Sequence, residues 1–88
     1  NIPRMLKTGL TARVEKAAVP VLPVFDVIQK AGNISEHDMF NTFNMGVGMV
    51  VAVAKQDADK ALRLLAQSGE KAYIIGEIIQ GEEGVLLV

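Results

Sequence analysis

The longest apolar stretch of the chain, residues 45–54, restricts its fold more than any other feature. It ends in Met49-Val50-Val51-Ala52-Val53, a nearly continuous run that is rich in β-branched side chains. Such a run is typical of a strand buried on both faces, because a strand with one solvated face alternates apolar with polar residues. We therefore predict a central strand at 49–53. The stretch is far shorter than the roughly 20 residues that cross a bilayer, so no membrane partner is expected.

The size and composition of the chain limit the possible classes of protein. Its 88 residues suffice for one small domain, expected to span residues 1–88, and a hydrophobic content of 50% is too high for a disordered tail. The absence of cysteine excludes disulfide scaffolds and thiol nucleophiles. Because the start of the chain also does not resemble a signal peptide, a cytoplasmic location is expected. A net charge of −1 disfavours a nucleic-acid partner.

The first half of the chain predicts one strand and two helices. Residues 10–14 alternate apolar with polar side chains, which indicates a half-buried strand. Pro23 suits the first turn of a helix that ends at Gly32-Asn33. Ser35 is a typical N-cap of a second helix, with Asp38 three residues later.

The second half predicts a helix followed by two strands. Asp57 is expected to cap the helix and Gly69 to end it, and the residues between them that form an apolar stripe are Ala58, Ala61, Leu62 and Leu65. Residues 72–79 and 85–88 are predicted strands, joined through Gly81-Glu82-Glu83-Gly84 as a hairpin. The fold class expected is α+β, with helices packed on a mostly antiparallel sheet. The expected core comprises Phe40, Phe43, Val50, Val51, Val53, Leu62, Leu65, Ile74 and Ile75.

Few residues suggest catalysis. His37 is the only histidine, and without a cysteine or a second histidine it lacks a metal-ligand set. Glu82 and Glu83 are adjacent, so in an extended segment they point to opposite sides and do not form an acid/base pair. Ser35 lacks the context of a nucleophilic serine and serves better as a cap. Catalytic residues are therefore left unassigned and no metal ligand is predicted.

Gly46-Val47-Gly48 and the Asn44 that precedes it allow two interpretations. Asn44 or Gly46 could supply a left-handed residue that ends a helix. Alternatively, successive backbone N–H groups in such a turn could face an anion or a carbonyl group. The order of elements is the reverse of a dinucleotide-binding fingerprint, and the lysine of a P-loop is missing.

The N-terminal segment Asn1-Ile2-Pro3-Arg4 also allows two interpretations. Proline fixes the backbone beside a guanidinium, which can bind a phosphate through two parallel hydrogen bonds. Residues 1–16 carry Arg4, Lys7, Arg13 and Lys16 against Glu15, so the segment could face an anion or could simply be solvated.

These signals occur together in an order that resembles the phosphoribosylformylglycinamidine cyclo-ligase family, also called aminoimidazole ribonucleotide synthetases. The resemblance covers essentially all of the chain and is most specific at 43–49. It is carried by Asn1-Ile2-Pro3-Arg4, Ala31-Gly32-Asn33, Met39-Phe40-Asn41-Thr42-Phe43-Asn44-Met45-Gly46-Val47-Gly48-Met49 and Gly69-Glu70-Lys71-Ala72-Tyr73-Ile74-Ile75-Gly76-Glu77-Ile78.

The resemblance implies the C-terminal part of a two-domain, ATP- and Mg²⁺-dependent homodimeric enzyme. That enzyme closes the imidazole ring of formylglycinamidine ribonucleotide in purine biosynthesis and releases ADP and phosphate. The partners it implies are the ribonucleotide, ATP and a missing N-terminal domain that holds most of the nucleotide-binding machinery. A related formylglycinamidine ribonucleotide synthetase, or a non-catalytic α+β interaction module, is the alternative.

The resemblance also implies which residues bind substrate or phosphate. Asn1 and Arg4 match the family's Asn-Ile-Pro-Arg motif, and Asn44, Met45, Gly46 and Gly48 match its turn at the interdomain cleft. None of them is an obvious proton acceptor, which phosphoryl transfer does not require, because its catalysis relies mainly on positioning and electrostatics. Arg4 and the turn are expected to lie on the same side of the domain.

We predict that the 88-residue chain alone has no cyclo-ligase turnover and no useful affinity for ATP. Its sequence contains neither a phosphate-binding P-loop nor an acidic metal cluster. Calorimetric titration of the chain with magnesium-ATP tests this, and micromolar binding would contradict it.

Overall fold

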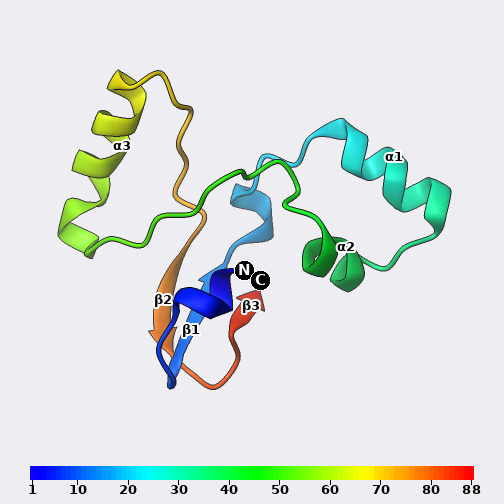
Figure 1. Ribbon diagram of the computed structural model, residues 1–88, viewed down its shortest axis with the longest axis horizontal. Coiled ribbons are helices and arrows are strands. Elements are labelled where there is room, and N and C mark those ends of the chain that lie inside the picture. The colour runs from blue at the N-terminus through cyan, green and yellow to red at the C-terminus, as the bar shows by residue number, and fades with distance from the viewer. The chain divides into compact units, whose positions relative to one another are not determined.

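The computed structural model describes residues 1–88 and divides into two compact units. Unit 1 consists of Asn1–Ala18 and Val50–Val88, and unit 2 is Val19–Met49. The helices are α1 (Pro23–Gly32), α2 (Glu36–Thr42) and α3 (Ala58–Gln67), the strands are β1 (Leu10–Val14), β2 (Gly76–Gln80) and β3 (Val85–Leu87), and the 3₁₀ helices are η1 (Ile2–Met5), η2 (Lys16–Ala18) and η3 (Lys55–Asp57). The predicted α+β class is confirmed (Figure 1).

Strand β1 is the centre of a three-stranded sheet with the order β2-β1-β3 (Figure 1). It pairs antiparallel with β2, from Leu10↔Gln80 to Val14↔Gly76, and parallel with β3, from Ala12↔Val85 to Val14↔Leu87. The sheet is therefore mixed. The strand predicted at residues 10–14 is confirmed with the same bounds.

The hairpin predicted through residues 81–84 is wrong, because β2 and β3 lie on opposite sides of β1. The 81–84 loop instead crosses the start of β1. There the Gly81 N–H donates to the Gly9 carbonyl at 3.0 Å, and the Thr11 hydroxyl donates to the Glu83 carbonyl. A Cβ on Gly81 would lie 2.5 Å from Thr11 Oγ1. The glycine thus permits a close crossing, a role that sequence cannot distinguish from a tight hairpin.

The central strand predicted at residues 49–53 is also wrong. The segment forms no strand, and the side chains of Met49, Val51 and Val53 are exposed. Both edges of β1 are occupied by β2 and β3, and no other strand of the chain pairs with this segment. A run of β-branched residues indicates a preference for extended backbone, but it does not supply the partner that a strand needs.

The core differs from the predicted one for the same reason. Its buried hydrophobic residues lie on β1, in α2 and in connecting segments, and they are Ala12, Val14, Val19, Met39 and Met45. None of the residues expected in the core is fully buried, since that expectation assumed a central strand under helices. Phe40, Phe43, Val50, Leu62, Leu65 and Ile75 are half-buried, and Val51, Val53 and Ile74 are exposed.

The two helices of unit 2 follow the predicted signals. Helix α1 starts at Pro23 and ends at Gly32, and its C-cap Asn33 has a left-handed φ of 49°. Ser35 caps α2 by accepting a hydrogen bond from the Asp38 N–H at 3.1 Å. The rings of Phe25 and Phe43 lie 5.9 Å apart between centroids, which holds α1 beside the end of α2.

Helix α3 of unit 1 is confirmed as well. It begins after Asp57 and is followed by Gly69, whose φ is 86°, but the Asp57 side chain forms no capping hydrogen bond, so the expected cap is wrong. Its predicted apolar stripe is half-buried, while the remaining positions are exposed. No helix of the structure has the length and apolar character needed to span a membrane.

We predict that Thr11→Val lowers the free energy of unfolding by about 1–3 kcal/mol, because it leaves the Glu83 carbonyl without its donor. Thr11 is 1% exposed and valine has nearly the same shape, so the change isolates the hydrogen bond. Urea denaturation would measure the loss, with the exposed Thr8→Val as the control. Equal midpoints for the two variants would mean that the crossing does not depend on this hydroxyl.

Candidate functional site

The N-terminal segment forms a short 3₁₀ helix that presents a guanidinium to solvent. In η1 the Arg4 N–H donates to the Asn1 carbonyl at 3.1 Å, and the Leu6 N–H donates to the Pro3 carbonyl at 3.2 Å. Asn1 and Arg4 are thus joined within one turn. The Arg4 side chain is exposed and forms no ion pair within the chain. It is available to an anion.

A close contact between the Pro3 ring and Gly84 brings η1 against the end of the 81–84 loop. A Cβ on Gly84 would lie 2.7 Å from Pro3 Cβ, so only glycine lets the end of the 81–84 loop pass so near. Beside this contact is a shallow depression of about 250 Å³, lined by Lys7, Thr8 and Glu82 among others. Sequence reasoning counted Lys7 within the basic segment but did not select these three residues, because the crossing loop that gathers them was not predicted.

The other predicted site residues lie in a tight turn that follows α2. The Val47 N–H donates to the Asn44 carbonyl at 2.9 Å, and the central residues Met45 and Gly46 have φ values of 56° and 103°. Two positive φ angles in succession are typical of a type I′ turn. Methionine seldom adopts this conformation, and here its side chain is only 5% exposed, so its burial offsets the strain.

The two glycines of the turn are not equivalent. Gly46 needs its positive φ, and a Cβ there would lie 3.0 Å from Leu22 Cγ. Gly48 has neither constraint, since its φ is ordinary and no atom lies within 4 Å of the position of a Cβ. The fold of this chain therefore explains Gly46 and leaves Gly48 unexplained. A glycine that the local backbone and packing do not require is typical of a place where a ligand or another backbone approaches closely.

The hydrogen bonds of the turn bear on both interpretations of Asn44–Gly48. Helix α2 ends at Thr42 with an extended Phe43 as its C-cap, so neither Asn44 nor Gly46 ends it. The Asn44 Oδ1 accepts from the Gly46 N–H at 2.9 Å, and the Val47 N–H is used by the Asn44 carbonyl. Within the chain the Met45 and Gly48 N–H groups keep no acceptor. An anion could therefore bind the Met45 and Gly48 N–H groups and the Asn44 side-chain amide. The N–H groups of Gly46 and Val47 between them are already bonded within the turn, so the donors do not form a continuous row.

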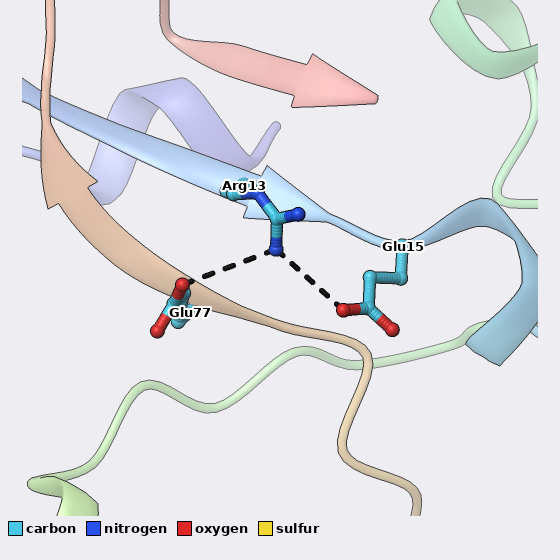
Figure 2. Close-up of polar contacts among 3 residues, drawn as sticks. All are labelled: Arg13, Glu15 and Glu77. Carbon is cyan, nitrogen blue, oxygen red and sulfur yellow. Dashed lines mark ion pairs between the residues drawn. The ribbon is translucent and has the colours of Figure 1, made fainter. Parts of the chain in front are cut away.

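A third polar group lies on the β1–β2 pair and is structural in character. Figure 2 shows Arg13 between two carboxylates, with Nη1 3.5 Å from Glu15 Oε1 and 3.9 Å from Glu77 Oε1. Arg13 and Glu77 are cross-strand partners, so the pairing of the strands itself brings them together. These half-exposed pairs contribute little stability.

No part of the chain gathers a metal-binding set of histidine, aspartate or glutamate side chains. His37 is exposed in the first turn of α2. A surface ion pair within α1 raises the pKa of Lys30, first through a hydrogen bond with Asp26 and then through the charge of its carboxylate. This pair has no neighbour that suggests a site.

The predicted site residues thus fall into two groups. Asn1 and Arg4 share η1 in unit 1, and Asn44, Met45, Gly46 and Gly48 share the turn in unit 2. Whether Arg4 and the turn face one cleft stays a prediction.

Comparisons with known proteins agree with the expected resemblance. The family described as "AIR synthase related protein, C-terminal domain" matches residues 1–88. The chain is 55% identical over 87 residues to a phosphoribosylformylglycinamidine cyclo-ligase of Lachnoclostridium phytofermentans, covering 99% of this chain and 26% of that protein. Its identity to a protein of the same name from Bifidobacterium longum subsp. infantis is 50% over 88 residues, covering 100% of this chain and 26% of the relative. The chain thus spans about a quarter of the length of these relatives.

We predict that Gly46→Ala lowers the free energy of unfolding by about 1–3 kcal/mol, because alanine would be strained at positive φ and pressed against Leu22. Gly48→Ala is the matched control and should leave stability unchanged or raise it by about 0.4–1 kcal/mol. Thermal or urea unfolding of both variants measures the difference. Equal losses would show that the turn does not set the requirement for glycine.

Proposed function

The chain belongs to the AIR synthase related protein C-terminal domain family, and from this membership we propose that it is the substrate-side part of a phosphoribosylformylglycinamidine cyclo-ligase. The observation that carries the proposal is the 55% identity to a protein of that name over 99% of the chain. A formylglycinamidine ribonucleotide synthetase is not favoured, because the relatives that cover the chain bear the cyclo-ligase name.

The proposed reaction of the longer enzyme closes an imidazole ring in purine biosynthesis. The formyl oxygen of formylglycinamidine ribonucleotide takes the γ-phosphoryl group of ATP, which leaves as ADP. An amidine nitrogen then attacks the activated carbon, and the C–O bond to the phosphate breaks as the ring closes. The products are aminoimidazole ribonucleotide, ADP and phosphate.

We assign binding rather than acid/base roles to the residues of this chain. The exposed guanidinium of Arg4 suits a phosphate group, to which it can donate two parallel hydrogen bonds. Met45 and Gly48 carry unused N–H groups on one turn, and Gly48 leaves room for a ligand to approach. Preorganised donors of this kind stabilise charge that develops during phosphoryl transfer.

The cofactors implied for the longer enzyme are ATP and Mg²⁺. The residues of this chain do not fit a Mg²⁺ site, because no three carboxylate or imidazole side chains converge. We therefore assign this chain no role in metal binding. An N-terminal domain, a homodimeric assembly and a cytoplasmic location are further elements of the proposal.

Arg4→Ala in the longer enzyme is predicted to lower kcat/KM by roughly 10- to 150-fold, since a charge-assisted contact contributes about 1.5–3 kcal/mol. Steady-state kinetics with varied ribonucleotide would measure this. The matched control is Arg63→Ala, which removes an exposed arginine of α3 that lies outside the family motif.

The kinetics of Arg4→Ala separate a functional role from a structural one. A folded Arg4→Ala enzyme with a reduced kcat/KM and an unchanged unfolding midpoint supports a substrate contact. Full activity of that enzyme would remove Arg4 from the site, and an equal loss in Arg63→Ala would show a non-specific effect of charge.

A further inference from the structure

Gly84, at the end of the 81–84 loop, is a glycine that its own backbone conformation does not require. Its φ is not left-handed, unlike the φ of 88° at Gly9. A Cβ at Gly84 would nevertheless lie 2.7 Å from Cβ and 2.8 Å from Cγ of Pro3. Packed carbon atoms keep about 3.5–4.0 Å apart, so the requirement for glycine comes from the neighbouring η1.

The loop side of this contact is held by β1. The Ala12 N–H donates to the Gly84 carbonyl at 3.1 Å, and the Thr11 hydroxyl donates to the carbonyl of the residue before Gly84. Thr11 and Ala12 are 1% and 5% exposed, so both donors belong to buried residues. Val85, the residue after Gly84, begins β3 and pairs with the same Ala12. Gly84 therefore cannot retreat from η1 without disturbing the sheet.

The other side of the contact, η1, is held less firmly and moves as one piece. In Figure 1 it lies beside β1, and none of its residues is buried. The Arg4 N–H donates to the Asn1 carbonyl, and the Leu6 N–H donates to the Pro3 carbonyl, so the residues around the Pro3 ring belong to one hydrogen-bonded turn. A displacement of the ring is therefore passed on to Arg4, which follows it in the chain.

We propose that Gly84 is a positioning residue, which sets the place of the Arg4 guanidinium through its contact with Pro3. This inference rests on the proposed function, in which Arg4 binds a phosphate group of the substrate. A contact of 2.7 Å has to open by about 1 Å to reach an ordinary separation of carbon atoms. Two parallel hydrogen bonds to a phosphate require a defined geometry, and a shift of about 1 Å is enough to weaken them.

The first test is Gly84→Ala in the longer enzyme. Because Arg4 is assigned to binding, the variant should raise KM for the ribonucleotide roughly tenfold, a smaller effect than the removal of the guanidinium in Arg4→Ala. Steady-state kinetics with varied ribonucleotide measure this. A merely structural role gives a different result, because a smaller fraction of folded enzyme reduces the apparent kcat and leaves KM unchanged.

The matched control is Gly69→Ala, a second change of glycine to alanine in unit 1. Gly69 has a φ of 86°, and no atom lies within 4 Å of the position of a Cβ. Alanine there strains the backbone but does not press on η1. Gly69→Ala should therefore lower the unfolding midpoint and leave KM for the ribonucleotide unchanged.

Two double variants test the route of the effect. In an Arg4→Ala background Gly84→Ala should add little to KM, because the guanidinium that it displaces is gone. In a Pro3→Gly background it should also add little, because the ring on which the new Cβ presses is gone. Pro3→Gly alone should raise KM, since η1 loses the ring that rests against the loop. Pro3 is exposed, so this variant tests the contact even if Gly84→Ala does not fold.

The results separate this inference from the proposed function. If Arg4→Ala raises KM but Gly84→Ala and Pro3→Gly do not, Gly84 has no positioning role and the binding role of Arg4 stands. An equal rise in KM for Gly69→Ala, or a full effect of Gly84→Ala in the Arg4→Ala background, would also overturn the inference. An Arg4→Ala enzyme with unchanged kinetics would remove the binding role of Arg4, and the positioning role would fall with it.

Discussion

The fold of unit 1 depends on the occupation of both edges of β1. Strand β2 supplies one partner and β3 the other, and the 81–84 loop that joins them must cross the start of β1. Thr11 helps to hold this crossing, because its buried hydroxyl donates to the Glu83 carbonyl beside the bond from the Ala12 N–H of β1 to the Gly84 carbonyl. The same loop then lies so close to Pro3 that it holds η1, and with it Arg4, beside the sheet. One strand thus links the core of unit 1 to the segment proposed to bind phosphate.

Local signals in the sequence predict the elements well and their partners poorly. The bounds of β1, the start of α1 at Pro23 and the cap of α2 by Ser35 follow from side chains within a few residues of each element, and the structure confirms them. The central strand at 49–53 and the hairpin at 81–84 are wrong because they concern pairing between distant segments. The periodicity of a sequence shows which face of a strand is apolar. It does not show which other strand will pair with each edge, because that depends on all the strands of the fold together.

The candidate site shows the same division between local and distant information. Left-handed backbone at Gly46 can be predicted from the pattern Asn-Met-Gly-Val-Gly, and the structure confirms it. Asparagine prefers turns of this kind, so a hydrogen bond from the Gly46 N–H to the Asn44 side chain could be anticipated from the sequence. Only the structure shows that this bond removes the Gly46 N–H from the donors that a ligand could use. The depression beside η1 is lined by Lys7, Thr8 and Glu82, which come together because the 81–84 loop crosses β1. No pattern in the sequence indicates that these residues lie close together. The relation between Arg4 and the turn depends on two units and lies beyond local patterns altogether.

The parallel pairing of β1 with β3 has a kinetic consequence. The Thr11 hydroxyl and the Glu83 carbonyl are 72 positions apart in the sequence, so the sheet closes only after most of the chain has been brought into one large loop. Long-range contacts of this kind raise the contact order and slow folding, while α1, α2 and α3 can form from neighbouring residues in microseconds. During synthesis on the ribosome β1 emerges before β3, so it must wait for residues 85–87 before its second edge is covered. In this interval its uncovered edge is open to pairing with other chains, which is the general route to aggregation of a slowly completed sheet.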